Sequence, residues 1–462
     1  MSQVSAQKNN TMLIKWAINI LIPLVILFMP TNETFTVGMK GFLVITVWAI
    51  LSFIFETLPT TTTSICLMFG YAFFNVAPLA TVLSSWAGST PWMVFGSLVL
   101  VNVVQRTTLM RRIAYWLLIK TGGTYAGIIY ALITLCVISN ILVGSTLMLI
   151  AILTLAYGIT QALELGKSKA SAGIMMATAM CFLDAGNFIF TPNGFGVLMG
   201  ICATITPLEI SYLNFFIQNA VFVPLVYILG FIIIKIMKPE KSIDGKQYFI
   251  EQYKALPKIT KEEKKLTGVL IGLLIYLFTI TWHGYDMMYG FLIAAFILYF
   301  PGFKIGTPQD VAKADFGVLI FVTACMSIGS AASYVGIGPV FSSLVLPVLA
   351  NAGSYAFIVI TWVIIVAGNF LMTPGAEFAV FGPALTQICV DLGINPMPML
   401  YAFYQGTNNL LFPYESTLVL IAFGYGNVHM SDFIKCWGMK MIVCAIYLCA
   451  LGIPYWMLIG IL

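Results

Sequence analysis

Three acidic side chains, Asp184, Glu377 and Glu415, fall inside otherwise apolar stretches of the sequence. A carboxylate at membrane depth is costly, so it is a candidate for function. Each of the three could ligate Na⁺, carry a proton or pair with a basic group, and we regard all three as candidate ion-coupling residues. The alternative is a protonated or hydrogen-bonded carboxyl group at a kink in a helix.

Stretches of Gly, Pro, Asn and Ser interrupt the apolar runs at 139–140, 187–196, 368–373 and 405–417. Polar backbone at membrane depth must be buried in protein or line a wet cavity. Half-helix N-termini at such breaks favour a carboxylate, whereas unwound carbonyls and Asn, Ser or Thr oxygens favour Na⁺. The alternative is that these residues serve close helix packing.

The elements that must position these breaks are membrane-spanning helices. Apolar residues make up 60% of the 462 positions and charged residues only 8%, with a mean hydropathy of +0.98, whereas soluble domains carry about 25% charge. Continuous apolar runs of about 20 residues favour helices over the alternating strands of a barrel. We therefore predict an all-α integral membrane protein with several transmembrane helices, in contact with lipid and without a nucleic-acid partner.

Charge predicts the orientation, because cytoplasmic loops are rich in Lys and Arg. Lys8 and Lys15 precede the first apolar run, which we expect to be a retained helix with its N-terminus in the cytoplasm and the C-terminus of the chain outside. A further acid-free group of basic residues is Arg106, Arg111, Arg112 and Lys120. The arginines could form an anion funnel, but we favour anchors that reach lipid headgroups. No Lys or Arg is expected inside the deep segments.

The order of elements repeats. We divide the chain into an N-terminal segment and first helix (1–37), a first repeat (38–237), a cytoplasmic linker (238–265) and a second repeat (266–462). The expected hairpins lie at about 125–157 and 354–386, and the expected broken helices at about 171–205 and 396–428. An uncharged piece, Tyr334–Gly353, is expected outside the membrane. Inverted repeats with broken helices are typical of secondary transporters, with substrate bound near the midplane.

Other classes of protein fit less well. An integral membrane enzyme needs a catalytic set, but the sequence has only two histidines, both near expected helix ends, and we predict no enzyme activity. The nine cysteines include no CxxC pair, so neither a disulfide framework nor a metal site is expected. A channel would not need paired breaks.

Three stretches carry a resemblance to the divalent anion:sodium symporter (DASS) family of the ion transporter superfamily. WMVFGSLVLVNVVQRTTLMRRIAYWLL, residues 92–118, is similar to that family's fourth span and its arm helix. KADFGVLIFVTACMSIGSA, from Lys313, is similar to the corresponding part of its second repeat, and IAFGYGNVHMSDFIKCWGMKM resembles its closing segment. The match covers nearly the whole chain, as that of a divergent member.

The resemblance implies about eleven transmembrane helices, two re-entrant hairpins, an elevator mechanism and a homodimer, each protomer having a scaffold and a transport domain. In this family each hairpin tip carries Ser-Asn-Thr and each broken span a Thr-Pro-Pro-Asn type of turn, which together hold a dicarboxylate and Na⁺. Carried over, the substrate-binding candidates are Ser139, Asn140, Thr191, Pro192, Asn193, Gly368, Asn369, Pro413, Ser416 and Thr417. The Na⁺ candidates are Ser139, Asn140, Asn187, Asn369 and Thr373.

The sequence departs from the family pattern at both tips. Ile141 replaces the threonine of the first tip, and Gly368-Asn369-Phe370 keeps only the asparagine of the second. We expect Na⁺-coupled transport of a small organic anion, a di- or tricarboxylate first, across the cytoplasmic (inner) membrane. The alternative is a monocarboxylate, a sulfonate or an inorganic oxyanion, moved by H⁺ coupling or by exchange. No organic cofactor is expected.

Overall fold

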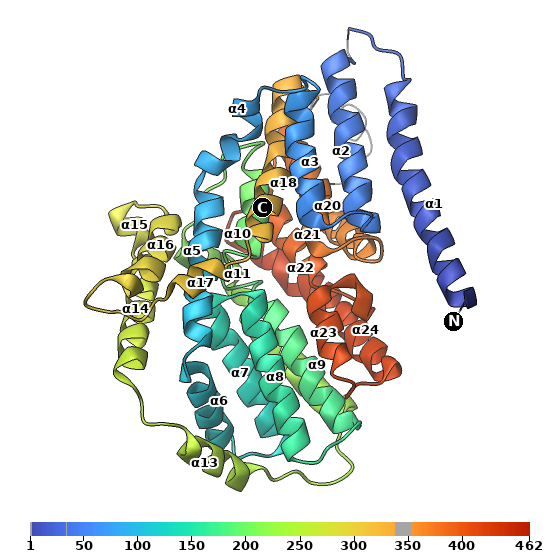
Figure 1. Ribbon diagram of the computed structural model, residues 1–462. Helices are drawn as coiled ribbons and strands as arrows, with labels where there is room; N and C mark the ends of the chain where they lie inside the picture. Colours follow the sequence, from blue (N-terminus) through green and yellow to red (C-terminus); the bar gives the residue numbers. More distant parts are fainter. Residues whose placement is uncertain (1, 34, 338–352) are drawn as a thin grey trace.

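The computed structural model describes residues 2–33, 35–337 and 353–462, and most of them lie in helices (Figure 1). Within these ranges there is no strand, and the one isolated antiparallel bridge joins Thr124 to Asp244. A helix satisfies its backbone hydrogen bonds within one apolar segment, as a lipid environment requires. The all-α class predicted from the sequence is confirmed.

Five helices of the described part are long and apolar enough to cross a membrane singly: Val37–Phe55, Tyr125–Leu142, Tyr212–Ile236, Phe316–Val335 and Met430–Leu458. The bent pair formed by Ser89–Gln105 and Leu109–Lys120 makes a sixth. Several apolar segments are instead divided into shorter helices. The chain is thus an integral membrane protein, and the expected total of eleven spans stays a prediction.

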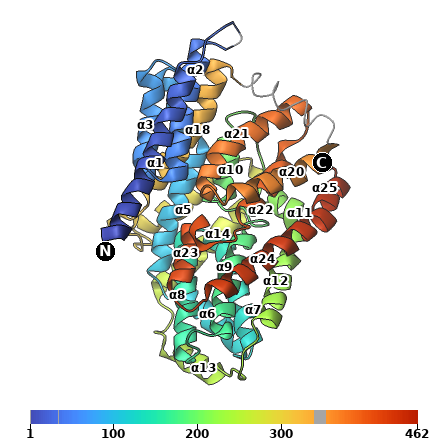
Figure 2. The same cartoon turned by 90° about the vertical axis from the view of Figure 1, so that its right-hand side faces the viewer.

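One end of the molecule is a bundle of α1 (Ser2–Leu27), α2 (Val37–Phe55), α3 (Thr60–Phe73) and α18 (Phe316–Val335), seen at the top of Figures 1 and 2. Polar contacts join α1 to α2. The buried Asn19 amide donates to the Ser52 hydroxyl at 2.8 Å and to the Thr57 hydroxyl at 3.0 Å. The outer side of α1 exposes leucines, isoleucines and valines, as a lipid-facing helix does.

Helix α5 (Ser89–Gln105) is followed by α6 (Leu109–Lys120), which we call the arm. The chain bends by 66° between the two helices. At the bend, Arg106 holds both oxygens of Asp310 at 2.7 Å and also donates to the Ile305 carbonyl. Further along, Arg112 donates to the Pro257 carbonyl at 2.6 Å and lies 3.6 Å from Glu263. Two of the expected lipid anchors therefore bind the second half of the chain, because carboxylates and carbonyls of that half lie within reach.

Four helices follow the arm: α7 (Tyr125–Val143), α8 (Thr146–Ala162), α9 (Lys169–Ala185) and α10 (Phe195–Cys202). The side chains of Thr124, Ser145 and Ser168 cap the first three by accepting backbone N–H bonds. Residues 144–145 join α7 to α8, and both helices pack on α9 (Figure 1). The chain leaves helical geometry at 186–194, inside the apolar run.

The middle of the chain continues with α11 (Tyr212–Asn219), η2 (Ala220–Phe222), α12 (Val223–Ile236), α13 (Lys246–Ala255), α14 (Lys261–Phe278), α15 (Ile280–His283), α16 (Met287–Phe296), η3 (Ile297–Tyr299) and α17 (Pro308–Ala312). The short helices between α3 and α5 are α4 (Leu79–Val82) and η1 (Ser84–Ala87). Helix α13 lies within the expected linker and packs on α6, at the lower end of both views. Helix α16 packs along α5. The expected piece Tyr334–Gly353 falls almost wholly on 338–352, outside the described residues.

The last part contains α20 (Gly353–Gly368), α21 (Pro374–Leu392), α22 (Pro396–Thr407), η4 (Pro413–Glu415), α23 (Thr417–Gly424), α24 (Met430–Tyr447), the π-helical turn η5 (Leu448–Gly452) and α25 (Ile453–Leu458). Helix α20 packs on α22 as α7 packs on α9. The chain leaves helical geometry again between α22 and α23. Within the described residues, α20–α23 thus form a pair of helices followed by an interrupted helix, as α7–α10 do.

Glu263 joins the N-terminal end of the arm helix α6 to the start of α14 through hydrogen bonds. Its carboxylate accepts the Thr108 N–H at 3.0 Å, the Thr108 hydroxyl and, in a capping box, the Thr260 N–H at 3.1 Å. Burial alone would raise the pKa of Glu263, but these hydrogen bonds and the nearby Arg112 lower it below its ordinary value of 4.5. Its contribution to stability is therefore present above pH 4.5 and is lost as the pH falls through the lowered pKa.

We expect Glu263→Gln to lower the free energy of unfolding near pH 7 by about 1–2 kcal/mol, because the charged acceptor is lost. Thermal melts of the purified protein between pH 3.5 and 8 measure this. The difference in Tm from the wild type should shrink toward the acid end. Glu262→Gln, an exposed change of the same kind one residue away, is the control. An equal loss in both variants would contradict this role.

Candidate functional site

The two interrupted helices meet at their breaks. The side-chain amide of Asn408, which follows α22, donates to the Asn187 amide oxygen at 3.3 Å and to the Leu183 carbonyl at 3.4 Å. Asn408 and Asn187 are 221 positions apart in the chain. Carbonyls near the C-terminus of a helix have no partner within that helix. The break after α22 therefore supplies a hydrogen-bond donor, the Asn408 amide, to acceptors at the break after α9. The tertiary structure therefore joins two of the four interruptions in one place.

Each hairpin tip is tied to the broken helix of its own half by an asparagine. Asn140 donates to the carbonyls of Cys136, at 2.9 Å, and Phe182, at 3.2 Å. Asn369 donates to the carbonyls of Gly406, at 3.0 Å, and Asn409, at 3.1 Å. Both asparagines are buried, and the Asn369 amide oxygen has no hydrogen-bond partner among the described residues. The two tips thus use the same residue type, although Asn140 makes one of its two bonds to its own helix α7 and Asn369 makes both bonds to the broken helix.

The first tip lies directly on the turn that precedes α10. A Cβ atom on Gly144 would come within 3.2 Å of the Thr191 Cβ, so the tip has no space for a larger residue there. Thr191 and Pro192 are buried, and the Tyr404 hydroxyl reaches Thr191 from α22. The residues that lead into α8 and those that lead into α10 are therefore in contact at this turn, and backbone N–H groups at helix N-termini favour an anion.

Two of the hydroxyl and amide candidates in the first half are occupied by other groups. Ser139 donates to the Cys136 carbonyl at 2.9 Å, within its own helix. The Asn193 amide donates to the Ser97 hydroxyl of α5 at 3.0 Å, but its amide oxygen is buried without a partner in the described part. Asn193 therefore links the turn to a different helix and keeps one acceptor free.

The second half places acids at the corresponding helix starts. Glu415, next to the buried Pro413 and Ser416, accepts the N–H groups of Leu411 at 2.9 Å and Phe412 at 3.1 Å. Neither Ser416 nor Thr373 caps the helix that follows it. The side chain of Thr417 lies outside the described part of the structure.

Glu377 lies in the first turn of α21, and its carboxyl group faces the second tip. A Cβ atom on Gly368 would lie 2.5 Å from its Oε1, and Glu415 is near enough to interact with it electrostatically. Both carboxyl oxygens are buried without a hydrogen-bond partner among the described residues. A buried charge without a partner is costly, so this group requires a proton or a cation. No cluster of three His, Cys, Asp or Glu side chains suited to a metal lies within the described ranges.

The expectation that no lysine lies inside a deep segment is wrong at Lys440. This residue is ten positions into α24, roughly 15 Å from its start at 1.5 Å per residue, and is fully buried. Its ammonium lies 3.2 Å from Asp184 Oδ1 and donates to the Asn408 carbonyl at 2.5 Å. A lone lysine at the bilayer centre costs about 3 kcal/mol on insertion scales, and the pairing offsets this cost. The isolated Lys in GMKMIVCAIY was the signal in the sequence.

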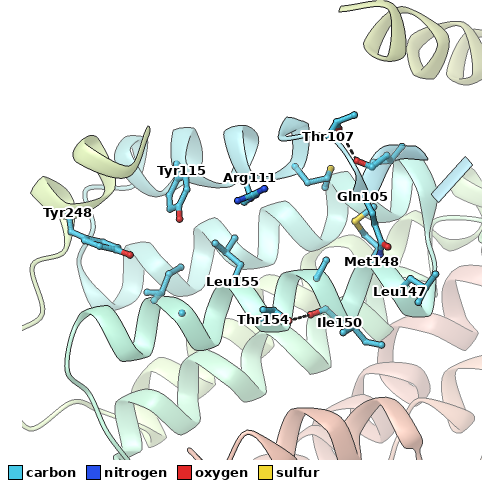
Figure 3. A pocket seen from close by; sticks show the side chains of 15 residues that line it. Gln105, Thr107, Arg111, Tyr115, Leu147, Met148, Ile150, Thr154, Leu155 and Tyr248 are labelled. Carbon is cyan, nitrogen blue, oxygen red and sulfur yellow. Dashed lines mark hydrogen bonds between the residues drawn. The ribbon is translucent and has the colours of Figure 1, made fainter. Parts of the chain in front are cut away.

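A cavity of about 580 Å³ lies between α6, α8 and α13 (Figure 3). Arg111 and Tyr115 from α6 and Tyr248 from α13 line it opposite Leu155 and Thr154 of α8. Leu147 and Met148, at the first turn of α8, also line it. The cavity therefore extends from the arm to the helix turn that follows the first tip, and Arg111, unlike Arg106 and Arg112, is directed to it.

Comparison with known proteins supports the membrane-transporter fold. The solved structure of the Alcanivorax borkumensis YdaH transporter is similar with a TM-score of 0.59 at 12% identity, over 91% of this chain and 99% of that chain. At this identity the likeness concerns the fold alone. A comparison with curated protein sequences gives no match.

The family model described as "Sodium:sulfate symporter transmembrane region" matches residues 10–462, nearly the whole chain. The divergent DASS-type membership predicted from the sequence is confirmed by this match. The chain belongs to the sodium:sulfate symporter family.

Proposed function

We propose that the protein is a secondary active transporter that moves a small anion across the cytoplasmic (inner) membrane, coupled to Na⁺. The observation that carries this proposal is the crossing of the two broken helices at Asn187 and Asn408, with a hairpin tip tied to each. Broken helices at the midplane supply N-termini for an anion and carbonyls for a cation. A di- or tricarboxylate is the first substrate class. No catalytic role and no organic cofactor are part of the proposal.

The two halves differ in charge, and we assign them different roles. In the first half the residues that lead into α8 and α10 are in contact and neither helix has an acid in its first turn, and this is where we place the anion. In the second half Glu415 accepts backbone N–H groups and Glu377 faces the tip, so the protein's own carboxyl groups occupy that side. A cation there would neutralise them and allow an anion to bind nearby.

The cavity beside Arg111 is the route that we assign to the anion on the cytoplasmic side. It ends at the start of α8, next to Ser145 of the first tip. We further propose that a hairpin-bearing transport domain moves against a scaffold in a homodimer, as in an elevator, with the N-terminus in the cytoplasm and the C-terminus outside. Rigid-body movement of one repeat region around a fixed site is typical of transporters with such repeats.

A second candidate substrate is an inorganic oxyanion or another anion such as a monocarboxylate or a sulfonate, with H⁺ as a possible coupling ion. Two observations favour it. The family description names sulfate, and the tips lack the threonine hydroxyls expected to hold two carboxylates.

Uptake into proteoliposomes tests the proposal. We expect saturable uptake of succinate, malate or citrate that falls at least tenfold when choline replaces Na⁺ in the external medium. Uptake of sulfate or a monocarboxylate instead would favour the second candidate. Conduction that does not saturate and does not respond to the Na⁺ gradient would contradict the proposal.

Glu377 and Glu415 are tested by their amides. If they bind the coupling cation, Glu377→Gln should lower the apparent affinity for Na⁺ at least tenfold, because a neutral amide is a weaker ligand than a carboxylate. Glu415→Gln should have a smaller effect, since backbone groups already hold this side chain. Initial uptake rates against Na⁺ concentration measure both. An unchanged Na⁺ dependence in the two variants would remove them from the coupling site.

The close approach of Glu377 to the second tip is tested by Gly368→Ala. The added methyl would lie 2.5 Å from Glu377 Oε1 and 3.1 Å from the Phe381 ring, so the carboxyl group must move and Na⁺-dependent uptake should fall several-fold. Gly424→Ala is the matched control, because its methyl group meets nothing within 4 Å. Equal uptake in the two variants would show that the carboxyl position does not matter.

A further inference from the structure

The buried pair of Lys440 and Asp184 is given no role in transport above, although it lies where the two broken helices cross. Helix α9 ends at Ala185 and α22 at Thr407, one residue beyond Asp184 and one residue before Asn408. The last carbonyls of each helix lack intrahelical partners, and a helix C-terminus carries a partial negative charge. The C-terminal ends of α9 and α22 and the Asp184 carboxylate therefore lie close together, and a positive charge beside them would offset their combined negative charge.

Lys440 supplies that charge from a third helix. Its ammonium binds one carboxylate oxygen, Asp184 Oδ1, and one unwound carbonyl, that of Asn408, and it lies 4.8 Å from the centre of the Trp437 ring. The Asn187 amide also donates to Asp184 Oδ1 at 3.2 Å. The other carboxylate oxygen, Asp184 Oδ2, is buried without a hydrogen-bond partner among the described residues. One oxygen of the Asp184 carboxylate is thus available to accept a further bond.

These acceptors are of the kind that binds a bare monovalent cation. Unwound carbonyls and half-helix C-terminal ends coordinate Na⁺ in transporters with broken helices, and a carboxylate adds a full negative charge. The ammonium group is likewise a compact monovalent cation that binds oxygen atoms. It differs in being attached to the chain, so it can neither leave with the substrate nor be supplied by the ion gradient.

We propose that the Lys440 ammonium is a tethered cation that takes the place of a bound Na⁺ at the crossing of the two broken helices. This position then stays occupied throughout the transport cycle and adds nothing to the number of Na⁺ ions that are coupled. The inference rests on the proposed function, because it concerns the ion requirement of that same transport. It also predicts a latent Na⁺ site: without the lysine side chain, Asp184 and the Asn408 carbonyl would accept a small cation.

The test is the thermal stability of the purified full-length protein in detergent, without substrate, as Na⁺ replaces choline at constant ionic strength. Removal of Lys440 in Lys440→Ala should lower Tm in choline. Added Na⁺ should restore part of the loss, by roughly 1 °C for each tenfold by which Na⁺ exceeds its dissociation constant, beyond any rise in the wild type. A Na⁺ response equal to that of the wild type overturns the inference. So does failure of Lys440→Ala to fold in both salts, since a small cation then cannot replace the ammonium.

Two further variants test whether a new Na⁺ response arises from the loss of the Lys440 charge beside Asp184 or only from the loss of the side chain's volume. Lys440→Arg keeps a tethered cation, and Asp184→Asn with Lys440→Met removes both charges, so neither should gain a Na⁺ response over the wild type. A gain in the doubly neutral variant would assign the new Na⁺ effect to another site and overturn the inference. The result is independent of anion uptake: a wild-type protein that transports no anion would refute the proposed function, whereas the difference between Lys440→Ala and the wild type would still decide the role of the lysine.

Discussion

The structure depends on one constraint: backbone groups that leave a helix within an apolar membrane protein must find partners inside the protein. At each break the side-chain amide of an asparagine donates hydrogen bonds to such groups. Asn140 and Asn369 donate to carbonyls of the broken helices from the tips, and Asn408 donates across to the other break. These contacts tie the interruptions to the rest of the protein and fix the positions of the half-helix ends. The arrangement of charges at the site follows from that geometry.

The charges at the crossing are distributed unequally. The C-terminal ends of α9 and α22 converge on a lysine ammonium, whereas the starts of α21 and α23 carry or adjoin the carboxyl groups of Glu377 and Glu415. The starts of α8 and α10 have no acid in their first turns. The first position therefore has a positive side chain beside its carboxylate, the second has carboxyl groups, and the third has neither.

The arm connects this centre to the rest of the molecule. Arg106 and Arg112 bind Asp310, the Pro257 carbonyl and Glu263, so α5 and α6 are joined to the linker, to the start of α14 and to α17. Hydrogen-bonded carboxylate pairs of arginine are stronger than neutral hydrogen bonds. Helix α8, on the other side of the cavity, packs chiefly on α9 and also on α7, α23 and α5. Helix α7 packs on both α6 and α9, so the helices on the two sides of the cavity beside Arg111 are in contact with one another.

The sequence by itself determined the helical membrane class, the family and the places where helices break, because length, hydropathy and Gly, Pro and Asn punctuation are local properties. It also marked Asp184, Glu377 and Glu415, since an acid in an apolar run is conspicuous. It did not determine partners. Lys440 is visible in the sequence as an isolated lysine in an apolar run, but its pairing with Asp184, 256 positions away (440 minus 184), is not. Only the tertiary structure decided that Asp184 is paired while Glu377 has no partner among the described residues, because burial and pairing are properties of helices brought together from distant parts of the chain.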